Sequence, residues 1–312
     1  MFKSINTPRF LPILGVLMLL AGLVAALYGP AEAYGFYLFS QGGRFYFEGF
    51  GFGSLVFAII AWQVIAYELI ALLLIPLGIA HLRLQRWARL WAIALMWCAW
   101  IVGAPLVVVF LVLLSFKDPT PAAALLALLA AVLAYLALPG LLIRFYQGAT
   151  IRQAFESKDP NPSWLERLPM PVLVLTLLFS GYVIALHFPL FFNGLYPLFG
   201  AWLNGLNGIL ALDVSILCLA LLAWGVSQRK AWAWWGSLAY FGLLTASTLT
   251  TLLRSSFAEI LALVRLPPTE MDILKNVPLQ GAHLAPFVGL PLALTLLAIL
   301  LSKRHFGRQV TS

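Results

Sequence analysis

The sequence has few charged residues for its length. Lysine, arginine, aspartate and glutamate make up 10% of the 312 residues, whereas a soluble domain usually carries about 25%. A soluble fold of this size needs a polar surface, and these residues are too few to supply one. The chain is 62% hydrophobic, with a mean hydropathy of +0.97. These values exclude an ordinary soluble domain and predict an all-α integral membrane protein.

Cysteine is also scarce, and the motifs of familiar enzymes are missing. Cys98 and Cys218 both lie inside apolar runs, where we interpret them as small hydrophobic residues rather than a disulfide or a ligand pair. The sequence contains no HExxH, GxSxG, phosphate loop or CxxCH pattern, and its four histidines lack the spacing of metal ligands. We therefore predict no metal, no cofactor and no catalytic residue, and favour a protein without enzymatic activity.

The basic residues do not form a surface for nucleic acid. The net charge is +8, but lysine and arginine occur singly or in small groups between long apolar runs, without a basic stripe interleaved with aromatic residues. This placement is typical of topology signals and of contacts with anionic lipids. We expect membrane lipids as partners and exclude nucleic acid.

Eight segments are long and apolar enough to cross a bilayer, which takes about 20 residues per helix. The first is followed by Ala31-Glu32-Ala33, which resembles a signal-peptidase site. Its apolar run is longer than a typical signal core, so we interpret it as a retained span. The predicted spans are 10–29, 53–80, 90–115, 122–143, 170–192, 207–227, 232–253 and 284–302.

The distribution of basic residues supports this count and gives an orientation. With the N-terminus inside, the inner segments hold 14 of the 19 lysine and arginine residues and the outer segments hold 5. This bias follows the positive-inside rule. It predicts a multi-pass protein of a bacterial inner (plasma) membrane with both termini in the cytoplasm. His81 and His305 lie beside the inner basic groups.

The connecting segments have distinct patterns. Two aromatic-rich runs around Gln41-Gly42-Gly43 predict a β-hairpin over 34–52. Helical spacing of apolar residues predicts a short interfacial helix over 257–264, ended by Pro267-Pro268. The inner segment 144–168 contains a turn at 159–162 and is predicted to be a linker between the four-span halves 1–143 and 169–312.

The two halves have the same outline of spans and loops. An offset of 145 residues pairs Trp87-Ala88 with Trp232-Ala233 and Glu68 with Asp213, and gives 7 identities in 34 between 62–95 and 207–240. The shared outline favours a duplication, and the low identity counts against it. A repeat of four spans would be parallel, which gives two parallel four-helix repeats about an axis along the membrane normal.

Glu68 and Asp213 are the acidic residues inside the predicted spans, which contain no lysine or arginine. From the inner ends at 80 and 227 they lie 12 and 14 residues deep, or roughly 18–21 Å at 1.5 Å per residue. Charge at that depth is costly and often marks an ion or proton pathway, so both are candidate transport or proton-binding residues. Alternatively, Glu68 is hydrogen-bonded to a neighbouring helix, and Asp213 favours the dipole at the N-terminal end of its own helix.

The seventh span is rich in hydroxyl groups. These either line a polar path or pack helices closely and bond back to the carbonyl four residues earlier. We favour packing. The residues are Thr245, Ser247, Thr248, Thr250 and Thr251.

Three classes of function remain. The leading one is a non-catalytic subunit or scaffold of a membrane complex, with other membrane subunits or a second copy of the chain as partner. The alternative is a transporter or permease for a small or hydrophobic solute that uses Glu68 and Asp213. The third is a membrane enzyme acting on a lipid-linked substrate. Sparse polar residues favour the first class, because a carrier for a polar solute needs more polar lining.

The transporter class makes one direct prediction. We expect Glu68→Gln to abolish proton-coupled flux, because the amide cannot exchange a proton, while the fold stays intact. The measurement is solute flux into proteoliposomes under a proton gradient, with circular dichroism as the control for folding. Unchanged flux would remove Glu68 from the mechanism.

Overall fold

The computed structural model describes residues 7–40, 42–46, 51, 53–115, 122–276 and 280–307. Within them, eight helical segments are long and apolar enough to cross a membrane, which confirms the predicted all-α membrane fold. The fourth is continuous through a π-helical turn, η1. The segments are α1 (Thr7–Phe39), α2 (Leu55–Leu82), α3 (Arg86–Ser115), α4–η1–α5 (Ala122–Val132, Leu133–Ala137, Leu138–Gln147), α7 (Met170–Ala185), α8 (Gly205–Ser227), α9 (Ala231–Arg254) and α12 (Gly281–Ser302).

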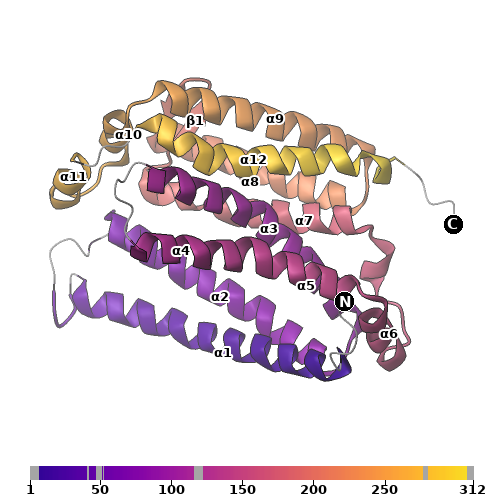
Figure 1. Ribbon diagram of the computed structural model, residues 1–312. Helices are drawn as coiled ribbons and strands as arrows, with labels where there is room; N and C mark the ends of the chain where they lie inside the picture. The colour runs from indigo at the N-terminus through magenta and orange to yellow at the C-terminus, as the bar shows by residue number, and fades with distance from the viewer. Residues whose placement is uncertain are drawn as a thin grey trace.

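The long helices lie side by side along one common direction (Figure 1). One end of the bundle carries a β-hairpin with α10 and α11, and we call it the hairpin end. The opposite end carries α6 and both chain ends, and we call it the termini end (Figure 1). The short elements are α6 (Ala149–Lys158), η2 (Trp164–Arg167), η3 (Phe188–Phe192), β1 (Tyr196–Leu198), β2 (Ala201–Leu203), α10 (Phe257–Val264), α11 (Pro268–Leu274) and η4 (Lys303–His305).

Helices α1 and α2 form a closely packed antiparallel pair. Gly15, Gly22 and Gly29 recur every seven residues on α1 and face α2, a spacing that keeps one stripe of a helix against its partner. A Cβ atom on Gly22 would lie 2.9 Å from the backbone nitrogen of Ile75, and one on Gly78 would lie 2.7 Å from that of Leu19. Small residues let helix backbones approach in this way, and inside a bilayer such contact drives association.

Helix α3 joins the two halves of the molecule. Ala88 and Ile93 belong to a buried cluster with residues of α1, α2, α5 and α6. Ala94 and Ile101 belong to a second cluster with residues of η2 and α7. The second half has its own core, in which Phe179 of α7 stacks on Phe241 of α9 at a centroid distance of 4.9 Å.

The inner segment 144–168 is folded rather than extended. It contains the end of α5, the helix α6 and the turn η2. Ile151, Phe155 and Leu165 are buried in the clusters around α3. The predicted turn at 159–162 lies outside any helix. The segment connects the two halves and also packs against both.

The predicted hairpin over 34–52 is wrong in its first arm. Residues 34–39 are the last turns of α1, and Tyr34 stacks on Tyr37, with ring centroids 6.4 Å apart. Aromatic residues three apart share a helix face, so this pattern also suits a helix. Gln41, residues 47–50 and Phe52 lie outside the described residues.

A hairpin forms instead at the same end in the connection between α7 and α8. Strands β1 and β2 pair antiparallel in the register Tyr196↔Leu203, Pro197↔Trp202 and Leu198↔Ala201. The turn residues Phe199 and Gly200 have φ values of 44° and 96°. Positive φ at both central residues is the geometry of a type I′ turn, whose twist matches that of the paired strands.

The predicted short helix over 257–264 is confirmed as α10, and its interfacial position stays a prediction. Its end differs from the prediction. Arg265 adopts a left-handed conformation with φ 58° and terminates α10 before the two prolines are reached. Pro268 occupies the first position of α11, where its missing N–H is not needed. The predicted duplication of the two halves stays a prediction.

Adding one methyl group at the α1–α2 contact should destabilise the fold. We expect Gly78→Ala to cost about 1–3 kcal/mol, because the new Cβ meets backbone atoms of α1 that cannot move independently. The matched control is Gly242→Ala in α9, where no atom lies within 4 Å of the added Cβ and the alanine favours the helix by about 1 kcal/mol. Thermal unfolding in detergent checks both variants. Equal melting temperatures would contradict this view of the contact.

Candidate functional site: an apolar cavity at the hairpin end

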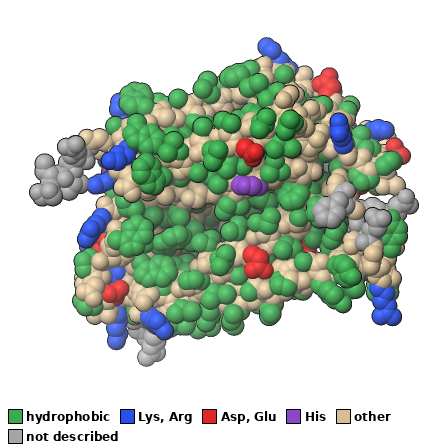
Figure 2. Space-filling model, turned by 180° about the vertical axis from the view of Figure 1, so that it is seen from behind, with side chains coloured by type: hydrophobic (Ala, Val, Ile, Leu, Met, Phe, Trp, Pro, Cys, Tyr) green, Lys and Arg blue, Asp and Glu red, His purple; other side chains and the backbone are tan. Residues whose placement is uncertain are grey.

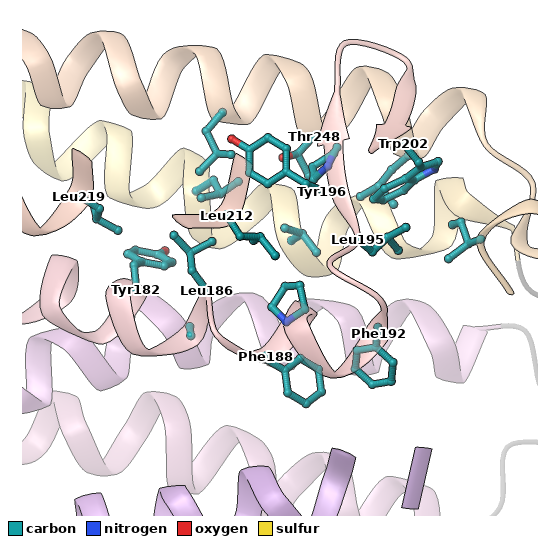
Figure 3. Close-up of a pocket in the computed structure, with 18 of the residues that line it drawn as sticks. Tyr182, Leu186, Phe188, Phe192, Leu195, Tyr196, Trp202, Leu212, Leu219 and Thr248 are labelled. Atoms are coloured by element: carbon teal, nitrogen blue, oxygen red, sulfur yellow. The ribbon is translucent and has the colours of Figure 1, made fainter. Parts of the chain in front are cut away.

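A cavity of about 460 Å³ lies among α7, α8, α9 and α12. It is bounded by η3, the β-hairpin and α10 at the hairpin end. Figure 3 labels lining side chains that come from α7, η3, the hairpin, α8 and α9. The aliphatic and aromatic lining residues include Leu186, Phe188, Phe192, Leu195, Leu212, Leu219, Phe241, Leu244, Ile260 and Leu292. The polar atoms of the lining side chains belong to Tyr182, Tyr196, Trp202, Tyr240 and Thr248.

Most of these polar groups bond to the protein rather than to the cavity. The Tyr182 hydroxyl lies 2.9 Å from Thr295 Oγ1, and the Trp202 indole donates to Ser255 Oγ at 2.7 Å. The Tyr240 hydroxyl is buried near Ser215 and makes no hydrogen bond of ordinary geometry among the described residues. No lining residue is charged and none is a histidine or cysteine. The wall can therefore make almost only apolar contacts with a ligand.

The β-hairpin is held in place by hydroxyl groups of α9. Ser247 accepts from the Phe199 N–H and donates to the Pro197 carbonyl, both at 2.9 Å. Thr251 accepts from the Gly200 N–H at 2.9 Å. A hairpin turn inside a membrane protein needs such partners, because its backbone groups are not paired by a helix.

The same observations show what the hydroxyls of the seventh span do. Thr245, Thr250 and Thr251 donate to the carbonyls of Phe241, Ala246 and Ser247, at 2.6, 2.7 and 2.8 Å. This is the predicted bonding to the carbonyl four residues earlier, and it is confirmed for these three. Ser247 instead fixes the hairpin, and Thr248 lines the cavity.

The cavity extends from the hairpin end past the middle of α8, since Leu219 lies 14 residues from the start of that 23-residue helix. Tyr182 lies in the last turn of α7, and Val288 lies two turns from the start of α12, both toward the hairpin end. Ala185 and Val288 are lining residues that are also exposed. The cavity therefore reaches the surface of the bundle on α7 and α12.

The structure does not bring Glu68 and Asp213 into this cavity. Glu68 is exposed on α2, and its Oε1 lies 2.6 Å from the position of a Cβ on Gly29 of α1. Asp213 is exposed on α8, eight residues from its start at Gly205. Neither residue lines the cavity. Their role in transport or proton binding stays a prediction.

A buried histidine–tyrosine pair was not predicted from the sequence. His81 is fully buried rather than part of a basic surface. Its Nδ1 lies 2.8 Å from the Leu77 carbonyl, and its Nε2 lies 2.8 Å from the Tyr146 hydroxyl. The carbonyl accepts only from an N–H, so Nδ1 carries the proton and Nε2 accepts from Tyr146. The pair connects α2 to α5, and its members are 65 residues apart in the chain.

Ion pairs at the termini end fasten the inner segment to α3. Arg86 pairs with Glu166 and lies 3.8 Å from Glu156. The Arg86 backbone N–H donates to Asp159 at 3.1 Å. The hydrogen bond from Arg152 to Glu156 is 2.6 Å long and lowers the pKa of Glu156. These contacts position α6 and η2, and we assign them a structural role.

Known proteins give no guide to this site. No protein-family model, no curated protein and no solved structure matches the chain. Among the described residues, no three histidine, cysteine, aspartate or glutamate side chains come together in a group able to hold a metal ion.

The hairpin anchor gives a test of how the cavity is built. We expect Ser247→Ala to cost about 1–3 kcal/mol, because it leaves the Pro197 carbonyl and the Phe199 N–H unpaired. Ser180→Ala is the matched control, since Ser180 is exposed and bonds only within its own helix, to the Thr176 carbonyl. Thermal unfolding measures both. A loss of the same size in the control would show that the hairpin anchor is not the cause.

Proposed function

We propose that this multi-pass membrane protein is a non-catalytic binding protein for a lipid-like molecule, whose hydrocarbon chain occupies the cavity at the hairpin end. The observation that carries the proposal is the cavity itself, with a volume of about 460 Å³ and walls of aliphatic and aromatic side chains. Ligand sites are typically concave, mostly apolar and few in number.

The size of the cavity indicates a chain rather than a small solute. A dry apolar cavity of about 150 Å³ accommodates benzene. The volume here is about three times larger, which corresponds to about 18 carbon atoms on the same scale. One acyl or isoprenoid chain of a lipid has this size.

The apolar walls favour hydrocarbon over water. A buried water needs two to four polar partners, and the lining tyrosine and tryptophan groups that could offer them mostly bond elsewhere. An empty cavity would forfeit dispersion contacts along its whole wall. Lipid tails are as apolar as the wall, so no hydrophobic driving force holds one chain in the cavity. Its retention depends on how well its shape packs against the aromatic residues of the wall.

This proposal bears on the three classes in different ways. A carrier or permease for a hydrophobic solute and a non-catalytic subunit that holds a lipid both fit the cavity. An enzyme for a lipid-linked substrate needs an acid or a base beside the substrate, and the lining supplies no carboxylate, histidine or lysine. The charge bias predicts that both termini lie in the cytoplasm of a bacterial inner membrane. The hairpin end then faces away from the cytoplasm, and the ligand would come from the outer leaflet.

Filling the cavity should displace its ligand. We expect Ala185→Phe, at the exposed edge of the lining, to weaken binding of a palmitic acid that carries a diazirine at least tenfold, because the ring occupies the space of the chain. Photo-cross-linking in vesicles measures the binding, and peptide mapping should place the cross-links on α7, η3 and the hairpin.

The matched control is Ala239→Phe on α9, which is exposed and outside the lining, and should label like the unaltered protein. Labelling spread evenly over all lipid-facing helices, or equal labelling of the two variants, would refute a chain-binding cavity.

A further inference from the structure

Four basic residues lie together at the termini end of the second half. Arg229 and Lys230 form the turn between α8 and α9, and Lys303 and Arg304 belong to η4, which follows α12. Lys230, Lys303 and Arg304 are exposed, and Arg229 is half-buried. We call these four residues the basic cluster.

Two contacts bring the parts of the basic cluster together from segments far apart in the chain. The Gly307 N–H, just after η4, donates to the Arg229 carbonyl at 3.5 Å. The Lys303 ammonium lies 5.4 Å from the centre of the Trp234 ring. Trp234 is one helical turn from Lys230, because its N–H donates to the Lys230 carbonyl at 3.4 Å. The start of α9 is therefore flanked by basic side chains from both segments.

The basic cluster has no acidic partner within the part of the chain that the structure describes. The ion pairs there involve Arg86, Arg152 and Lys275. The described acidic residues of the termini end all belong to the segment 156–166, where they contact Arg86 and Arg152. Figure 2 shows this division at its left end, where acidic side chains occur only in the lower half. Like charges in one place repel each other, and an anion among them replaces this repulsion with attraction.

Tryptophan rings flank the basic cluster. The Lys303 ammonium lies 5.8 Å from the centre of the Trp235 ring, and the rings of Trp224 and Trp232 lie 6.4 Å apart across the α8–α9 turn. All three tryptophans are exposed, and indole favours the boundary between headgroups and hydrocarbon. The cluster is thus next to a surface that suits the upper part of a lipid. Exposed apolar residues on the adjoining turns of α8 and α12 are Leu217, Leu221 and Leu301.

The positive-inside rule alone does not account for this arrangement. The rule requires basic residues on one side of the membrane, and charges spread over separate elements satisfy it. The first half meets it in this way, since Arg83, Arg144 and Arg167 follow α2, lie in α5 and end η2. In the second half, the fold instead gathers four basic residues where α8, α9 and η4 meet.

We propose that the basic cluster is a binding site for the phosphate headgroup of an anionic phospholipid. Guanidinium groups donate paired hydrogen bonds to phosphate, and ammonium groups act as point charges beside it. The rings of Trp224 and Trp232 contact the glycerol region, and the acyl chains lie along the exposed leucines of α8 and α12. Basic sites of this kind at span ends recognise anionic headgroups. The site is at the opposite end of the bundle from the cavity, and it does not rest on the proposed function.

Native mass spectrometry of the full-length protein in detergent tests the site. The probes are phosphatidylglycerol and phosphatidylcholine with the same acyl chains, each titrated separately. We expect phosphatidylglycerol to bind at least tenfold more tightly, because it alone carries a net negative charge. This preference should disappear in the quadruple variant Arg229→Gln, Lys230→Gln, Lys303→Gln, Arg304→Gln. Equal binding of the two lipids to the unaltered protein would overturn the proposal, as would an undiminished preference in the quadruple variant.

The matched control removes four other basic side chains of the same end, in the variant Arg83→Gln, Arg144→Gln, Lys158→Gln, Arg167→Gln. These residues are exposed and make no ion pair among the described residues, so the control loses the same net charge. It should keep the preference for phosphatidylglycerol. An equal loss in the control would show that total charge rather than the basic cluster attracts the lipid, and would overturn the site.

Two half variants guard against a failure of the quadruple variant to fold, which circular dichroism and gel filtration report. The variants Arg229→Gln, Lys230→Gln and Lys303→Gln, Arg304→Gln should each reduce the preference, because both segments hold one headgroup. A reduction in only one of them would overturn a shared site. An excess of inorganic phosphate should leave the lipid bound, because the acyl chains also contact the protein. Displacement of the lipid by phosphate would assign the cluster to a soluble anion instead.

Discussion

In hydrocarbon, every backbone N–H and C=O group needs a partner inside the protein, because no water is present to replace one. The long helices meet this need alone, and most of the chain is therefore helical. Where the chain leaves the helix inside the bundle, side chains supply the partners. Ser247 and Thr251 bond to the hairpin turn, and Glu270 accepts from the first N–H groups of α2 at 2.7 and 3.3 Å.

The same need shapes the cavity. Because α7 ends at Ala185, the chain between α7 and α8 has to be bonded to its neighbours, and it forms η3 and the hairpin. Residues of these short elements line the cavity at the hairpin end. The cavity lies beside these elements, among α7, α8, α9 and α12, and under the proposed function a lipid chain would supply the dispersion contacts that an empty cavity lacks.

The elements that local pattern specifies were predictable from the sequence, and the pairings between distant residues were not. Apolar length predicted the eight spans, and helical spacing predicted α10. Aromatic residues at 34 and 37 suit either a strand or a helix face, so the first arm of the predicted hairpin was wrong. No residue pattern near His81 indicates that its ring bonds to Tyr146. The cavity involves residues from Tyr182 to Leu292, and no local pattern marks such a site. Glu32 follows the predicted first span, which ends at residue 29, but it lies in α1, and its Oε2 is buried without a hydrogen-bond partner among the described residues.

Inside a bilayer, burial of apolar surface does not decide which helices meet, because lipid solvates that surface equally well. Specific association then depends on close backbone approach and on polar pairs. Within this chain the first is used between α1 and α2, through the glycine stripe. The second is used at His81–Tyr146 and Tyr182–Thr295. Glu68 and Asp213 are polar groups of the same kind, and neither has an ion pair or a hydrogen bond among the described residues. A carboxylate inside a span is costly, so these two residues weaken the fold unless a role such as the predicted transport or proton binding offsets the cost.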